Sequence, residues 1–128
     1  MVVARSSKEV FDYVLQEDRA LPVEKQTVFH LRRFSTRLAL RAQDLQASRG
    51  QVAELVLRSG IHGWSNFADG EGGVVECKHD KGIKTLWGCD VHNPLTLESM
   101  DRLSPEIAGE LASAIITGNT LTDEDVKN

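Results

Sequence analysis

The sequence predicts a single α+β domain, in which four to five helices accompany a small antiparallel β-hairpin or sheet. Apolar residues recur at helical spacing toward both ends of the chain, and one segment of the N-terminal third alternates at strand spacing. The middle third is rich in glycine, and each interior glycine costs a helix roughly 1 kcal/mol relative to alanine. Helical and extended segments cluster instead of alternating strictly, which favours α+β. The 128 residues suffice for one buried core and are too few for two.

Residues 6–34 are expected to form a helix followed by a strand. Ser6 and Glu9 stand at capping-box spacing, and the apolar residues after them fall on one helical face, which predicts a helix to about residue 18. The segment 26–34 is rich in β-branched and aromatic residues and predicts a strand.

Residues 36–58 are expected to form two helices. Ser35 is a favourable N-cap for the first helix, and the sequence around Gly50 interrupts the helical pattern before the second. Gly60 is suited to end the second helix.

Residues 60–92 form the most unusual stretch of the chain, and they predict a glycine-rich loop followed by a β-hairpin. The runs 74–79 and 83–87 are the expected strands, and Gly82 lies in the turn between them, where a positive φ is needed. Trp64 is expected to anchor the loop to the core. No reaction follows from this stretch by itself.

Residues 96–117 are expected to form the C-terminal helices. Ser104 and Pro105 give the clearest helix start in the chain, with an N-cap serine followed by proline at the first helical position. Ala108, Gly109 and Ala112 form a small-residue face that another element could approach closely. The tail 122–128 is expected to fray.

Charge and composition leave a local patch as the only basis for binding nucleic acid or a membrane surface. A formal net charge of -4 and a pI near 5.5 give no general attraction to nucleic acid or to anionic membranes. No apolar run approaches the roughly 20 residues that span a bilayer. We therefore expect a soluble, cytosolic protein whose two cysteines are reduced thiols, and no cofactor.

Two cysteines and two histidines of the middle stretch are candidate zinc ligands. They are Cys77, His79, Cys89 and His92. Zinc takes nitrogen and sulfur ligands of this kind in structural sites, but the single residue between the first two is closer than the usual spacing. A role for either thiol as a nucleophile is disfavoured, because no motif places it where it would be activated. We therefore expect no metal, and keep a small zinc-binding protein as the weakest alternative.

Three arginines recur every four residues on and just before the first helix of the 36–58 region. We call Arg33, Arg37 and Arg41 the arginine ridge. The ridge predicts a locally positive surface on an acidic protein. Aromatic residues for base stacking are not interleaved with it, so a protein partner or solvent is favoured over nucleic acid.

Four segments carry a family resemblance through their sequence and their order along the chain: residues 13–19, 21–32, 103–116 and 121–128. Together they resemble small proteins encoded in the structural gene clusters of tailed bacteriophages. The C-terminal half in particular looks like phage tail assembly chaperones. The glycine-rich stretch 60–92 departs from the plainer helical members of that group, which leaves a virion head or connector protein open.

The resemblance implies a non-enzymatic role in the host cytoplasm, in which the protein binds tape measure or tail tube subunits until the tail assembles. Two surfaces are expected to bind partners: the arginine ridge and one face of the last long helix, formed by Ile107, Ala108, Leu111, Ala112 and Ile115. Formation of a homo-oligomer stays open. A phage-encoded inhibitor of a host defence nuclease is a further alternative.

Overall fold

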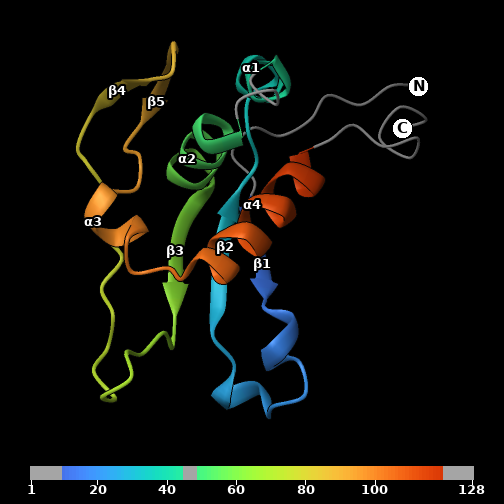
Figure 1. The fold of residues 1–128 in the computed structure, drawn as a ribbon, viewed down its shortest axis with the longest axis vertical. Helices are drawn as coiled ribbons and strands as arrows, with labels where there is room; N and C mark the ends of the chain where they lie inside the picture. The colour runs from blue at the N-terminus through green and yellow to red at the C-terminus, as the bar shows by residue number, and fades with distance from the viewer. Residues whose placement is uncertain (1–9, 45–48, 120–128) are drawn as a thin grey trace.

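The computed structural model describes residues 10–44 and 49–119, and it has the expected α+β class (Figure 1). Within these residues four helices accompany a three-stranded and a two-stranded antiparallel sheet. The elements in chain order are β1 (Val10–Val14), β2 (Val28–Arg32), α1 (Thr36–Asp44), α2 (Arg49–Gly60), β3 (Ile61–Ser65), β4 (Ile83–Leu86), β5 (Cys89–His92), α3 (Leu97–Met100) and α4 (Pro105–Asn119).

The helix expected up to residue 18 is wrong, because its described part is strand β1 followed by a 3-10 turn at Gln16–Asp18. Four of the five β1 residues are β-branched or aromatic, types that pack well in strands. All five residues of β1 pair with β2 in antiparallel register. The proposed capping pair, Ser6 and Glu9, lies outside the described residues.

The three-stranded sheet has the order β1-β2-β3, and helix α4 lies across one of its faces (Figure 1). Strand β2 confirms the strand expected at 26–34. Its Phe29 and Leu31 side chains are fully buried on the face toward the core, and the intervening residues are only half-buried. Trp64 and Phe67 pack edge-to-face with Phe29, so the aromatic anchor expected at the start of the middle stretch is present.

Helices α2 and α4 approach most closely at Gly60, the last residue of α2. A Cβ atom added at Gly60 would lie 2.7 Å from the Cγ2 atom of Ile115. The small-residue face expected to allow a close approach does not do so at Gly109, which is exposed and has open space around it. The glycine that permits close packing therefore lies on α2, facing a large residue of α4.

The hairpin expected between 74–79 and 83–87 is wrong in its pairing. Strand β4 pairs with β5, which follows it, and the turn is Trp87-Gly88. Both turn residues have positive φ, 49° and 83°, as two-residue hairpin turns of type I′ require. Gly82 also has the expected positive φ, but it lies just before β4 and does not turn that hairpin.

The expected helix starts are confirmed by their caps. The hydroxyl oxygens of Ser35, Thr96 and Ser104 accept hydrogen bonds from backbone N–H groups in the first turns of α1, α3 and α4, at 3.2, 3.1 and 3.2 Å. Helix α2 ends at Gly60 as expected. The tail 122–128 lies outside the described residues. None of the described helices is both long enough and apolar enough to cross a membrane.

Candidate functional site

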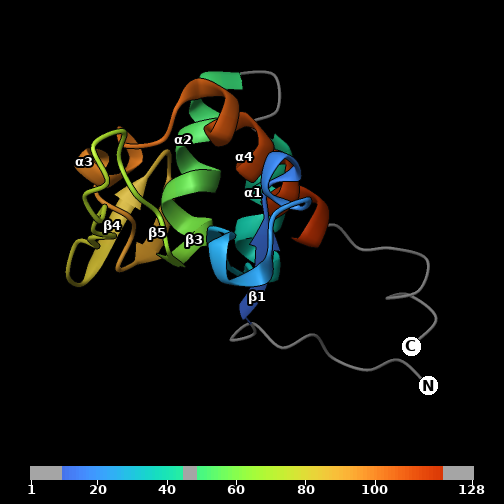
Figure 2. The same cartoon turned by 90° about the horizontal axis from the view of Figure 1, so that it is seen from below.

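The β4–β5 hairpin stands beside α2, apart from the three-stranded sheet, on the side of the molecule away from β1 (Figure 1 and Figure 2). An isolated two-stranded hairpin is marginally stable in water, so its position depends on contacts with the rest of the chain. Leu86 and Val91 of the hairpin pack on Leu55 of α2 as a small second core. This core fixes which face of the hairpin is turned inward.

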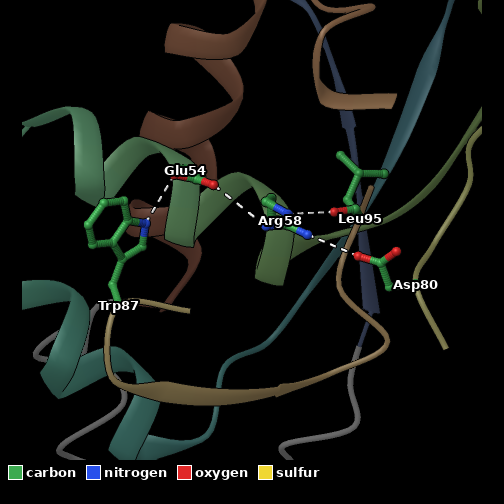
Figure 3. Close-up of polar contacts among 5 residues, drawn as sticks. All are labelled: Glu54, Arg58, Asp80, Trp87 and Leu95. Atoms are coloured by element: carbon green, nitrogen blue, oxygen red, sulfur yellow. Dashed lines mark hydrogen bonds and ion pairs between the residues drawn. The ribbon is translucent and has the colours of Figure 1, made fainter. Parts of the chain in front are cut away.

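Arg58 of α2 ties the segments before and after the hairpin to the helix (Figure 3). Its Nε atom donates to the Leu95 carbonyl at 2.8 Å, and its Nη2 atom donates to Asp80 at 3.0 Å. A second carboxylate, on Glu54, lies 3.5 Å from Nη1. Arg58 is only 8% exposed, and a charge buried to that extent is costly without such partners. The guanidinium therefore joins three segments that are distant in sequence.

The tip of the hairpin is held by two further hydrogen bonds. The indole N–H of Trp87 donates to Glu54 at 3.1 Å, so one carboxylate contacts both Arg58 and the tip (Figure 3). On the other side, Nε of Arg41 donates to the Trp87 carbonyl at 3.3 Å. The hairpin is thus attached to α2 at its base and to α1 and α2 at its tip.

The arginine ridge divides between two neighbours. Arg37 and Arg41 are exposed on α1, where Arg41 contacts the hairpin turn. Arg33 is half-buried elsewhere: it donates to the Gly118 carbonyl at the end of α4 and lies over the Phe11 ring, 5.2 Å from its centroid. Only the α1 part of the ridge therefore adjoins the hairpin.

The face of α4 expected to bind a partner packs inside the protein. Leu111 and Ile115 are fully buried in the main core, and Ile107, Ala108 and Ala112 are half-buried against it. In this fold these side chains hold α4 on the sheet.

The four candidate zinc ligands are not brought together. His79 contacts the Ile61 carbonyl, at 3.0 Å from Nε2, while Cys89 and His92 lie at opposite ends of β5. Burial raises the pKa of the Cys77 thiol to about 11, and it also raises that of Cys89. Across residues 10–44 and 49–119, no group of three or more histidine, cysteine or acidic residues is arranged to hold a metal ion.

The sequence reasoning missed a hydrogen-bonded chain on the open face of the sheet, formed by one residue from each strand. Asp12 of β1 lies 2.7 Å from Nδ1 of His30 on β2, and Nε2 of His30 lies 2.9 Å from the hydroxyl of Ser65 on β3. The sequence signal for this chain is the alternation of side chains in residues 10–14. It places Asp12 on the same face as His30 only if residues 10–14 form a strand.

These are the residue types of a serine-hydrolase triad, but their setting differs from one. Asp12 is 66% exposed, whereas the carboxylate of such a triad is buried beside its histidine. Water weakens the support that an exposed carboxylate gives to an imidazolium. We interpret the Asp12–His30–Ser65 chain as a polar cross-strand ladder.

On the same open face of the sheet, Arg32 extends the polar contacts toward the hairpin. Its Nε donates to Nδ1 of His62 at 3.3 Å, and its Nη1 donates to the His92 carbonyl at 3.2 Å. Burial, followed by the nearby Arg32 charge, lowers the pKa of His62. A polar network thus connects the main sheet with β5.

No family model, curated protein or solved structure matches the chain.

Proposed function

We propose that this is a non-enzymatic bacteriophage protein that assists tail assembly by binding tape measure or tail tube subunits in the host cytoplasm. The resemblance of the sequence to tail assembly chaperones suggests the process. The observation that carries a binding role is the β4–β5 hairpin, which is hydrogen-bonded to α1 and α2 at its tip and yet exposes large apolar side chains.

Trp87 at the hairpin tip and the arginines beside it are of the kinds enriched in protein interfaces, and Ile83 adds an exposed apolar side chain. Ile83 is 67% exposed and Trp87 is 41% exposed, and Arg37 and Arg41 lie on the neighbouring helix. Aromatic residues and arginine are over-represented at interfaces and among the residues that dominate binding energy. Holding Trp87 through Glu54 reduces the side-chain entropy that binding would cost.

The hairpin also offers backbone groups. In the described part of the chain no further strand pairs with β4 or β5. An extended segment of a partner could therefore add to either strand, which is a common mode of recognition. Such a mode suits the binding of an unassembled subunit, whose own strand partners are still missing.

Affinity capture from infected cells tests the proposal. A tagged wild-type chain should recover a tape measure or tail tube protein, identified by mass spectrometry, and a variant with Ile83→Ser and Trp87→Ala should lose it. The matched control is Leu21→Ser with Val23→Ser, two exposed apolar residues outside both the hairpin and α1, which should retain the subunit. Circular dichroism and thermal melting establish that both variants fold.

Other results of the same capture would replace the proposal. Recovery of a host nuclease would indicate an inhibitor of host defence. In a separate assay, detection of the chain in purified virions would indicate a head or connector protein. Retention of the subunit by the variant with Ile83→Ser and Trp87→Ala would show that the hairpin is not the contact surface.

A further inference from the structure

A groove of about 480 Å³ runs between the outer edge of β1 and helix α4. Phe11, Asp12 and Tyr13 line its strand side, and Ser113, Ala114 and Thr117 line its helix side. Strand β1 lies on the far side of the three-stranded sheet from the β4–β5 hairpin (Figure 1). The small helix residues leave room beside the strand.

The strand side of the groove offers backbone hydrogen-bonding groups. Strand β1 is the edge of its sheet, and within the described residues it pairs only with β2. The Val14 carbonyl accepts from the Arg19 side chain at 3.2 Å, so it points away from β2. Backbone groups alternate in direction along a strand, so those of Asp12 and Val10 also point outward. The short contact between the Asp12 and His30 side chains supports this outward direction of the Asp12 backbone groups. Cross-strand side chains lie closer together in pairs that share no backbone hydrogen bonds.

Contacts along the groove fix its width. One carboxylate oxygen of Glu110 on α4 accepts from the Tyr13 hydroxyl at 2.7 Å and from the Gln16 backbone N–H at 2.9 Å. Toward the end of α4, Gly118 packs on Phe11, since a Cβ at Gly118 would lie 2.5 Å from the ring. A site already held open loses less entropy on binding than one that must form.

The charge of β1 selects the occupant. Asp12 carries the one charge on the outer face of this strand and is 66% exposed. An added strand would place a side chain opposite Asp12, where lysine or arginine is favourable and an acidic residue is unfavourable. A second copy of the chain is disfavoured, because the antiparallel register that uses all of β1 would place Asp12 opposite Asp12 of the other copy.

We infer that the groove between β1 and α4 binds an extended segment of a partner protein as a fourth strand, with a basic residue opposite Asp12 and aliphatic side chains toward Ala114 and Thr117. The inference rests on the proposed function in one respect: the extended segment would come from a tail subunit. It gives the protein a second contact site, separate from the hairpin.

Binding of short peptides to the full-length chain tests this inference without any tail protein. The probes are a fluorescein-labelled seven-residue peptide alternating valine and lysine, and the same peptide with glutamate in place of lysine. Fluorescence polarisation should show roughly three- to tenfold tighter binding of the lysine peptide, from opposite-charge against like-charge pairing across strands. A lysine peptide with proline at its central valine keeps its charge but cannot pair as a strand, so it should bind more weakly.

Variants assign the binding to the groove. Asp12→Lys should reverse the preference, so that the glutamate peptide binds more tightly. His30→Gln removes the contact of Asp12 but keeps its charge, so the preference for lysine should remain. Thr117→Trp should block the groove from an exposed helix position, whereas Gly109→Trp, at another exposed position of α4 with open space around it, should bind like the wild type.

The inference is overturned if no peptide binds, if the proline peptide binds equally well, or if Asp12→Lys leaves the preference unchanged. A dimer in solution that Asp12→Lys strengthens would overturn it in favour of a second copy as the occupant. Capture of a tail subunit together with a negative peptide result would leave the proposed function intact and remove only this site. Peptide binding without capture of a tail subunit would retain the groove and remove the tail subunit as its ligand.

Discussion

At the residue scale, Arg58 has more consequence for this fold than Arg37 and Arg41, the two exposed residues of the arginine ridge. The ridge residues Arg37 and Arg41 are exposed on α1, whereas the Arg58 guanidinium is buried and joins α2 to the segments on both sides of the hairpin. The sequence does not distinguish these cases, because an arginine at the end of an amphipathic helix usually points to solvent.

Replacing Arg58 with methionine should lower the free energy of unfolding by about 2–3 kcal/mol, because Asp80 and the Leu95 carbonyl lose a charged donor while the side-chain volume is nearly kept. Urea unfolding followed by circular dichroism measures the change. Arg102→Met is the control, since Arg102 is half-exposed and lies 3.9 Å from Asp69, and such surface pairs contribute about 0–1 kcal/mol. Equal losses in the two variants would contradict the anchoring role of Arg58.

The Cys77 thiol should be a poor nucleophile at neutral pH. Its pKa of about 11 lies above that of an ordinary thiol because the group is buried, so less thiolate is present at any pH below that value. In a Cys89→Ser background, alkylation by iodoacetamide should be roughly a hundred times slower than for free cysteine near neutral pH, and should keep accelerating above pH 9. A rate that levels off near pH 8.5 would show that the thiol has an ordinary pKa.

Ser65 should not react with a fluorophosphonate probe, although His30 lies within hydrogen-bond distance of its hydroxyl. The reason is the exposed carboxylate of Asp12, which supports a charged imidazole only weakly in water. Labelling detected by mass spectrometry in the wild type, and lost in His30→Gln, would show that the three residues act as a catalytic triad and would contradict the non-enzymatic proposal.

At the scale of elements, the packing of α2 against α4 depends on one glycine. Gly60 and Gly109 both lie in helices, and the sequence indicated that the second would permit close packing. The structure shows that only Gly60 faces a neighbouring helix closely, at Ile115. The two glycines differ in whether another helix lies close to their backbone, and local sequence does not reveal this.

Alanine substitutions at these glycines should have opposite effects. Gly60→Ala should destabilise the protein by about 1–3 kcal/mol, because the added methyl group overlaps the Ile115 side chain. Gly109→Ala should stabilise it by up to about 1 kcal/mol, because alanine is the better helix former and the added methyl group meets nothing. Thermal and urea unfolding of both variants measure the difference, and a stable Gly60→Ala variant would show that Ile115 can move aside.

At the scale of the whole molecule, the fold separates a main core from a smaller attached unit. The main core lies between the three-stranded sheet and helices α2 and α4, and the hairpin has its own small core on Leu55. The hairpin and strand β1, whose residues line the groove, lie on different sides of the molecule (Figure 1 and Figure 2). One subunit could therefore contact two segments of a partner.

The attached unit should open separately from the main core. Native-state hydrogen exchange should show lower protection for the amides of β4 and β5 than for those of the central strand β2, since few buried residues hold the hairpin. In Arg58→Met, protection of the hairpin should fall further while β2 changes only by the global loss of stability. Equal protection of both sheets in the wild type would show that the molecule opens as one unit.

Local sequence signals are sufficient to predict several elements of the fold. The strand β2 and the helices α1, α3 and α4 follow from alternation or from capping residues such as Ser35, Thr96 and Ser104, because these act within one turn or one strand. The α+β class follows from these elements and from the glycine content of the middle stretch.

Three features follow from contacts between distant segments and not from local sequence. They are strand β1, the pairing of β4, and the polar chain of Asp12, His30 and Ser65. The segment of β1 fits a short helix or a strand equally well, and its backbone becomes a strand because the edge of β2 pairs with all five residues. The sequence allows strand β4 to pair with the segment before it or with the segment after it. Pairing with the later segment, β5, is favoured because it brings Leu86 and Val91 together against Leu55. These choices depend on residues far apart in the chain, so no local pattern contains them.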